Sequence, residues 1–148
     1  MTNKTLFKSH KDPLFSISII GIACFLIGID VYSIILYQDM SLVKALSLSI
    51  SLVVAGLILW MYFQTNYSLS KEDGISYKCG PLKGKIELNR IREITKGKTL
   101  WVGLKPATSR NGLIVKYDKY EEIYISPETN ESFIQKLLEL DNTIKIEL

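Results

Sequence analysis

Two long apolar runs dominate the first half of the chain and constrain its fold more than any other feature. Residues 14–37 and 42–63 contain only two charged side chains, Asp30 and Lys44. A helix rises about 1.5 Å per residue, so each run can cross a hydrocarbon core of about 30 Å. The sequence therefore predicts two transmembrane helices, which together form a membrane anchor over residues 1–65.

The short link between the runs and the flanking charges predict how the anchor is oriented. Residues 38–41 allow only a tight turn, so the two spans should form an antiparallel hairpin. Lysines gather near the outer ends of the spans, at Lys4, Lys8, Lys11, Lys71 and Lys78, and only Lys44 lies near the turn. Because basic residues are enriched on the cytoplasmic side, we expect a multi-pass protein of the cell membrane with both termini in the cytoplasm.

Small residues suggest a packing seam between the two spans. They are Gly21, Cys24 and Gly28 on the first span and Ser47, Ser51 and Ala55 on the second. Such stripes let helix backbones approach closely in membranes. With the turn centred near Met40, Gly28 lies level with Ser51, and Cys24 lies level with Ala55. The alternative is that small residues are simply common in these segments.

Asp30 is the acidic side chain deepest in a span, which makes it a candidate intramembrane contact. It lies about 200° around the helix from Gly28, so it should point away from the small-residue stripe, toward another protein. A carboxylate within a membrane costs a few kcal/mol, which favours a functional reason for its presence. The alternative is that Asp30 reaches interfacial water or a serine hydroxyl.

From residue 66 onward the apolar pattern changes from helical to alternating, which is typical of half-buried strands. Ile75, Tyr77 and Cys79 alternate with polar residues, as residues 85–88, 100–104 and 113–117 do. Turn-forming residues separate these runs, for example at positions 72–74 and 110–112. The pattern predicts six or seven short strands in an antiparallel meander that forms a barrel or a sandwich.

A helix should follow the strands and cap the barrel. Ser126 is suited to the N-cap and Pro127 to the first helical position. The apolar face of this helix consists of Phe133, Ile134, Leu137 and Leu138. A last short strand is expected at Ile144, Ile146 and Leu148. The predicted fold class is therefore α+β.

Four segments of this half carry a resemblance to a known family. They are residues 86–94 (IELNRIREI), 113–117 (LIVKY), 121–127 (EEIYISP) and Phe133-Ile134 with Leu137. Together they resemble bacterial pleckstrin-homology-like (PH-like) domains, of which one family carries two N-terminal spans. The resemblance implies that residues 66–148 form a cytoplasmic PH-like barrel capped by a helix, in a family whose activity is largely undefined.

The resemblance also bears on ligands. Eukaryotic relatives often bind phosphoinositides through basic residues beside the loop that joins the first two strands. Here that loop would be residues 71–74, which are net acidic, so we do not expect inositol lipid binding. The chain is also similar, more loosely, to membrane-anchored immunity proteins of bacteriocin producers.

Charge is unevenly distributed along the expected domain, with residues 78–119 strongly basic and residues 120–148 acidic. Each Lys or Arg near an anionic leaflet contributes about 1 kcal/mol to membrane attraction. The candidate contacts with the membrane surface or a partner are Lys83, Lys85, Lys96, Lys98, Trp101, Lys105 and Arg110. The alternatives are a merely solvated basic surface and a Trp101 that packs inside the domain. No nucleic-acid recognition motif is present, so a nucleic-acid partner is not expected.

The sequence offers little for catalysis or metal binding. His10 is the single histidine and lies in the polar N-terminal tail, so neither a catalytic triad nor a metal site is expected. Cys24 and Cys79 lie in different parts of the chain and are expected to be free thiols. No phosphate-binding glycine loop is present, so we expect a non-enzymatic protein without cofactors.

Two main functional hypotheses follow, beside a third in which the chain is an accessory subunit of a transporter. In the first, the hairpin holds a PH-like binding or scaffold module at the inner leaflet, where the module binds a protein partner or lipid headgroups. In the second, the chain is a bacteriocin immunity protein, with the hairpin and Asp30 making the decisive contact.

Overall fold

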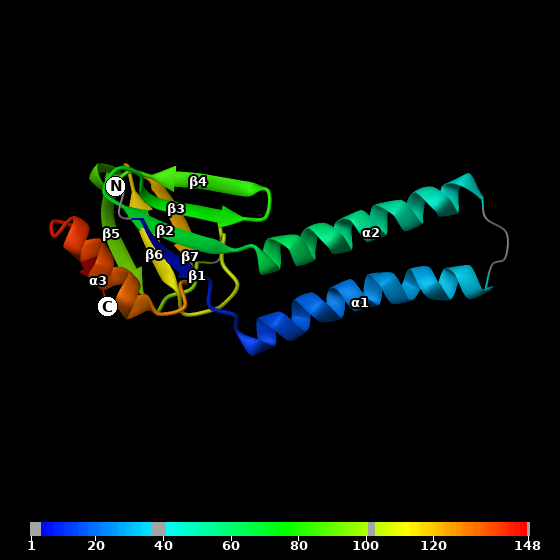
Figure 1. Ribbon diagram of the computed structural model, residues 1–148. Helices are drawn as coiled ribbons and strands as arrows, with labels where there is room; N and C mark the ends of the chain where they lie inside the picture. Colours follow the sequence, from blue (N-terminus) through cyan, green and yellow to red (C-terminus); the bar gives the residue numbers. More distant parts are fainter. Residues whose placement is uncertain (1–3, 37–40, 101–102, 148) are drawn as a thin grey trace.

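The computed structural model describes residues 4–36, 41–100 and 103–147. Two long helices project from one end of a lobe that is built from strands and one further helix (Figure 1). In chain order the elements are β1 (Thr5–Lys8), α1 (Pro13–Leu36), α2 (Leu42–Phe63), β2 (Asn66–Ser70), β3 (Gly74–Cys79), β4 (Leu82–Ile86), a short 3₁₀ turn (Leu88–Arg90), β5 (Ile91–Lys96), β6 (Leu113–Tyr117), β7 (Glu121–Ile125), α3 (Asn130–Leu140) and β8 (Lys145–Glu147).

The helices α1 and α2 begin and end close to where the apolar runs predict. Pro13 occupies the first position of α1, and the Asp12 side chain accepts a hydrogen bond from the backbone N–H of Leu14 at 2.9 Å. Both helices are long and apolar enough to cross a membrane, and most of their surface is exposed. The predicted turn between them falls mainly on residues 37–40, which lie outside the described part of the chain.

The predicted small-residue seam is wrong for α1. Gly21, Cys24 and Gly28 are exposed, and a Cβ atom added at either glycine would meet nothing within 4 Å. The buried small residue of α1 is instead Ala23. One residue corresponds to a rotation of about 100°, so the stripe expected at the seam faces outward.

The actual seam follows a repeat of 3.5 residues and includes large as well as small side chains. On α1 it consists of Ser16, Ile19, Ala23, Leu26, Asp30 and Ser33, and on α2 of Leu48, Ser51, Ala55, Ile58 and Tyr62. This spacing is that of left-handed antiparallel helix packing. On α2 the seam includes Ser51 and Ala55 as predicted, whereas Ser47 is exposed.

The lobe consists of two four-stranded sheets around one apolar core. The first has the order β1-β2-β3-β4 and the second the order β7-β6-β5-β8. All pairings are antiparallel except that of β8 with β5. Among the described residues no continuous strand pairing joins the two sheets, so the lobe is a sandwich rather than a closed barrel. This confirms the predicted α+β class with antiparallel sheets and a C-terminal helix.

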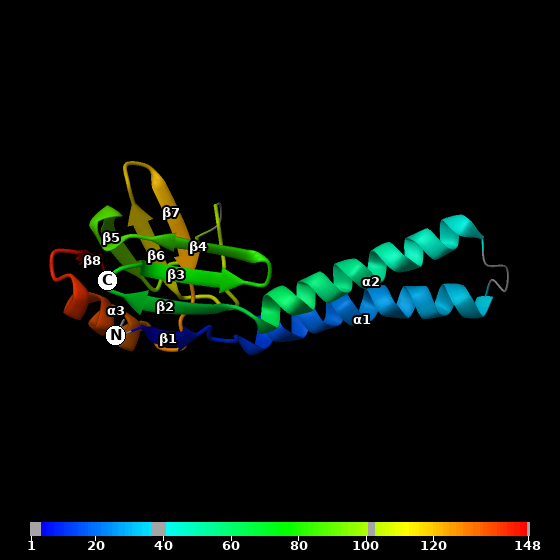
Figure 2. The same ribbon diagram turned by 45° about the horizontal axis from the view of Figure 1, so that its top comes forward.

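Strand β1 is the part of the lobe that the sequence analysis did not predict. Residues Thr5–Lys8 pair in antiparallel register with β2, with Lys8 opposite Asn66. The helical hairpin is therefore inserted between two neighbouring strands of one sheet (Figure 2). As a consequence, the loop at residues 71–74 joins the second strand to the third, and the hairpin itself joins the first two.

The C-terminal helix has the predicted apolar face but a different start. Phe133 and Leu137 are fully buried, and the Phe7 ring from β1 meets the Phe133 ring edge-on at 5.0 Å between centroids. The N-cap of α3 is Thr129, so the prediction that Ser126 caps it is wrong. The Ser126 side chain is buried in a hydrogen-bond network of the lobe and is not available to the helix.

Two further strand predictions had different outcomes. The predicted last strand forms as β8, Lys145–Glu147. The strand expected at residues 100–104 is absent among the described residues of that stretch, where Leu104 makes only an isolated bridge to Ile123. Residues 101 and 102 lie outside the described part.

Candidate functional site

The outer surface of the first sheet collects lysines from three strands. Because side chains alternate along a strand and the register is fixed, residues in a cross-strand row share one face. One row is Lys8, Asn66, Lys78 and Lys83, and the next is Leu6, Ser68, Ser76 and Lys85. Lys4 lies at the end of the same surface, which we call the basic face.

A shallow groove of about 400 Å³ runs over the basic face. Its floor consists of small polar side chains, including Ser68 and Ser76, and lysines line its sides. Leu6 adds one exposed apolar side chain. The lysines at the groove therefore favour an acidic ligand.

The lysines of the basic face differ in how their charge is compensated. Lys85 forms an ion pair with Asp73 at 3.0 Å, which lowers the pKa of Asp73 and raises that of Lys85. Lys78 and Lys83 are direct partners on neighbouring strands. Neither takes part in an ion pair with a described residue. Like charges directly opposite each other destabilise a sheet, so this pair costs stability in the unbound lobe.

Two of the predicted contact residues are neutralised by the acidic C-terminal part. Lys96 pairs with Glu131 of α3 at 2.5 Å, and Lys98 pairs with Glu147 of β8 at 3.5 Å. The hydrogen bond from Lys96 lowers the pKa of Glu131, and a hydrogen bond from Thr95 together with Lys98 lowers that of Glu147. Opposite charges that are separate in sequence therefore compensate each other on the second sheet.

Two further predicted residues, Arg110 and Lys105, lie at the base of the hairpin. Arg110 pairs with Asp12 at 3.2 Å. The backbone N–H of Leu14, followed by Arg110, lowers the pKa of Asp12. Lys105 lies at a pocket between the helices and the lobe. Trp101 lies outside the described residues. The six described residues of the predicted set thus occupy three different regions, and among these six only Lys83 and Lys85 lie on the basic face.

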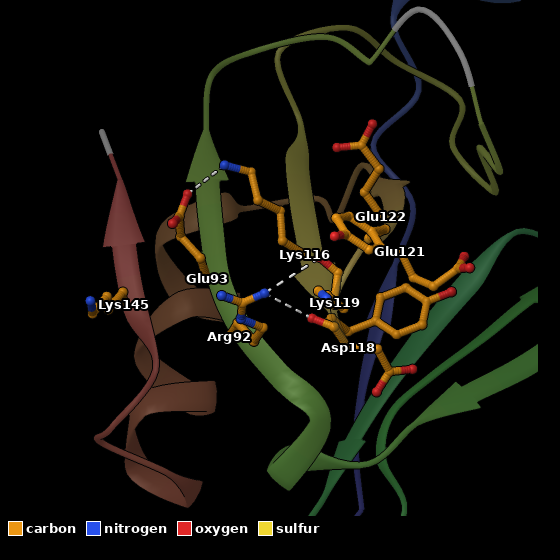
Figure 3. A pocket seen from close by; sticks show the side chains of 10 residues that line it. Arg92, Glu93, Lys116, Asp118, Lys119, Glu121, Glu122 and Lys145 are labelled. Carbon is orange, nitrogen blue, oxygen red and sulfur yellow. Dashed lines mark hydrogen bonds and ion pairs between the residues drawn. The ribbon is translucent and has the colours of Figure 1, made fainter.

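A hollow of about 300 Å³ lies at the end of β6 and β7, where charged side chains of both signs meet (Figure 3). Lys116 pairs with Glu93 at 2.6 Å, and Arg92 donates to the backbone oxygen of Asp118 at 3.1 Å. The hydrogen bond to Glu93 raises the pKa of Lys116. Since these charges compensate one another, the hollow has no preference for a ligand of one sign.

A buried polar network, which the sequence analysis missed, joins the lobe to the hairpin. The Tyr67 hydroxyl donates to the backbone oxygen of Pro106 and accepts from the backbone N–H of Ser126 at 3.1 Å. Thr108 donates to the backbone oxygen of His10 at 2.6 Å, and Ser9 bonds to Thr108 at 2.8 Å. Burial raises the pKa of Tyr67, so its hydroxyl remains a donor. The network fixes the segment before α1 against the loop that contains Thr108.

Asp30 lies at the helix seam, which corrects the expectation that it points away from α2. Its carboxylate accepts a hydrogen bond from the Ser51 hydroxyl. Asp30 lies at the seam because the face of α1 that meets α2 contains Ala23, whereas Gly21 and Gly28 lie on the exposed face. The structure therefore supports the explanation in which the Asp30 carboxylate bonds to a serine hydroxyl, and that serine lies within the hairpin.

Replacing Ser51 with alanine is expected to lower the free energy of unfolding of the hairpin by about 1 kcal/mol, because hydrogen bonds between membrane helices are modest. Ser47→Ala, on the exposed side of α2, is the matched control and should have no effect. Unfolding in mixed micelles measures both. Equal stability of the two variants would contradict a stabilising contact between Asp30 and Ser51.

The described residues contain no group of three side chains that suits a metal ion. His10 is exposed, Cys24 is exposed, and Cys79 is a buried free thiol whose sulfur lies 3.3 Å from the Thr65 hydroxyl oxygen.

Comparison with known proteins identifies the family. The family model for the bacterial PH domain matches residues 65–141, which is more than half of the chain. The match begins two residues after the end of α2 and covers β2 to β7 and α3. No curated protein and no solved structure matches the chain significantly.

Proposed function

Because this chain belongs to the bacterial PH domain family, we propose that it is a membrane-tethered, non-enzymatic binding module whose basic face recognises an acidic protein partner. PH-like domains are generally binding modules, which supports this class of function. The apolar hairpin would cross the cell membrane and hold the lobe at the inner leaflet.

The observation that carries the proposal is the direct pairing of Lys78 with Lys83. A pair of like charges across two strands destabilises the unbound sheet. A carboxylate seated between the two ammonium groups would reverse this penalty. The Lys78–Lys83 pair therefore lowers the stability of the unbound lobe and at the same time favours binding of an acidic partner segment.

A simpler explanation accounts for only part of the basic face. Lysines on an edge strand prevent sheets from pairing edge to edge, and β4, with Lys83 and Lys85, is an edge strand. Lys78 lies on β3, inside the sheet, where no edge needs protection. Its charge opposite Lys83 is better explained by a bound anion.

The direction of the basic face favours a protein over the lipid surface. Strands β2, β3 and β4 run lengthwise with the helices in both views (Figures 1 and 2). If the hairpin crosses the bilayer, the first sheet stands upright on the membrane, and its outer surface faces sideways. A protein beside the lobe can cover this surface, whereas a lobe lying flat on the leaflet would not fit this arrangement.

The insertion of the hairpin supports the proposed topology. Because β1 and β2 are paired neighbours, both ends of the hairpin emerge at the lobe. The lysines on β1 and β3 lie on this same side, which the positive-inside bias assigns to the cytoplasm. We therefore propose a multi-pass membrane protein with both termini in the cytoplasm.

Charge reversal on the basic face should abolish partner capture. With a photo-crosslinking residue in place of Ser76, membranes from intact cells should yield a discrete protein adduct of the full chain. Lys78→Glu with Lys83→Glu should lower its yield about tenfold, since both attractions become repulsions. The matched control is Lys119→Glu with Lys145→Glu, which changes the net charge equally but lies away from the first sheet. An adduct that persists after reversal, or adducts with lipid alone, would contradict the proposal.

The immunity hypothesis gains no support among the described residues. Its central residue, Asp30, is engaged by Ser51 within the hairpin. The binding-module proposal rests instead on an exposed surface and on family membership.

A further inference from the structure

A pocket of about 240 Å³ lies at the junction of α1, α2 and the lobe. It is lined by apolar side chains of both helices, including Ile19 of α1 and Ile58 of α2, and by Thr65, Lys105, Ala107 and Thr108. The helices supply an apolar wall, and the loop from the lobe supplies the opposite side. The basic-face groove is a separate feature, lined by other residues.

The two threonine hydroxyls of the pocket each have a hydrogen-bond acceptor, and a lysine side chain lies at the side of the pocket. The Thr65 hydroxyl donates to the backbone oxygen of Met61 at 2.6 Å, and the Thr108 hydroxyl donates to that of His10 at 2.6 Å. Lys105 is exposed and brings a positive charge to the apolar wall. This combination suits an amphipathic anion, with an apolar chain against the helices and a negative group at the lysine.

The surroundings of the pocket have the features of a membrane boundary. The Lys11 ammonium lies over the rings of Tyr62 and Phe63, at 4.8 and 4.6 Å from their centroids. Aromatic rings and lysines of this kind gather where apolar helices leave the hydrocarbon for the headgroups. The pocket is smaller than a typical site for a whole ligand, which is about 300–1,000 Å³. Part of one lipid chain fits it, because the rest of that chain can remain in the bilayer.

We propose that this pocket binds one anionic phospholipid of the inner leaflet, with an acyl chain lying against Ile19 and Ile58 and the phosphate at Lys105. The inference rests on the membrane placement given under the proposed function, and it is independent of the partner at the basic face. The bound lipid would touch both helices and the loop at Ala107, and so would join the hairpin to the lobe.

Lipid retention by the full chain tests this inference. The purified protein is reconstituted in vesicles of equal phosphatidylglycerol and phosphatidylcholine, floated on a density gradient, extracted in mild detergent and analysed by native mass spectrometry. We expect one retained phosphatidylglycerol per chain. Lys105→Gln should lower this retention about fivefold, the effect of one lysine near a lipid surface. Ala107→Leu, which fills the pocket without changing charge, should lower it as well.

Matched controls separate the pocket from the surrounding surface. Lys119→Gln removes an exposed lysine far from the hairpin, and Leu57→Trp enlarges an exposed side chain of α2 next to the pocket residue Ile58. Both should retain the lipid. Equal retention of the two phospholipids, or full retention by Lys105→Gln, would overturn the inference and leave the membrane anchor intact. Failure of the chain to float with the vesicles would overturn the membrane placement, and with it the inference.

Discussion

Replacing Phe133 with alanine should lower the free energy of unfolding of the lobe by about 4 kcal/mol, since large cavities in a packed core cost this much. Phe133 is fully buried, and its ring meets Phe7 edge-on. The substitution removes core contacts from α3 and also the aromatic partner of β1. The free energy of unfolding of native domains is only about 5–15 kcal/mol, so this loss is a large fraction of the total stability.

The loss should be much smaller at a half-buried position of the same helix. Leu138→Ala is the matched control, and we expect a cost of about 1 kcal/mol because part of that side chain already meets water. Urea unfolding of the full chain in detergent micelles, followed by circular dichroism, measures both variants. A cost below that of Leu138→Ala would show that α3 does not close the core.

A second measurement distinguishes loss of β1 from general unfolding. Strand β1 is short and holds its place through pairing with β2 and through the contact of Phe7 with Phe133. Without the Phe133 ring, trypsin should cleave at Lys8 faster than at Lys78, which lies inside the sheet. Equal acceleration at the two sites would contradict a specific role in holding β1.

The sequence predicts the architecture correctly where the apolar pattern is long or regular. The limits of α2 follow directly from the apolar run, and the buried face of α3 follows from the spacing of Phe133 and Leu137. Strand β1 was missed because four residues are too few for a periodicity to be recognised. Its pairing partner lies beyond both helices, so only tertiary contacts define it.

The helix seam shows how a local rule can be misapplied. Small residues predict one contact face of α1, whereas the structure uses another face, which contains Ser16, Ala23 and Asp30 at intervals of seven residues. The same interval separates Leu48, Ala55 and Tyr62 on α2. Gly21 and Gly28 are also seven residues apart, so this interval alone does not select the face that contains Asp30.

The candidate site was only partly predictable because charge along a chain is not charge on a surface. The basic run of residues 78–119 is divided between two sheets, and Lys96 and Lys98 meet glutamates of the C-terminal part. Strand register, which decides that Lys78 faces Lys83, cannot be derived from composition. Lys4 and Lys8 join the basic face only because β1 exists.

Replacing Tyr67 with phenylalanine should cost about 3 kcal/mol, although it removes a single oxygen atom. The hydroxyl bonds to the backbone oxygen of Pro106 and to the backbone N–H of Ser126, both within the buried network. An unsatisfied buried donor or acceptor costs about 1–3 kcal/mol. The phenylalanine ring fills almost the same space, so the loss reports on hydrogen bonds and not on packing. Tyr120→Phe is the matched control, because that side chain is 84% exposed.

Hydrogen exchange should show where the Tyr67→Phe lobe loosens. The network connects the loop at Pro106 and Thr108 to the segment that precedes α1, so amides of residues 104–110 should exchange faster than those of β3. The segment between β1 and α1 should respond as well, since Thr108 donates to His10. Uniform acceleration over both sheets would indicate a general loss of stability. Local acceleration at these two segments would show that the Tyr67 hydroxyl holds the helical hairpin in a fixed position on the lobe.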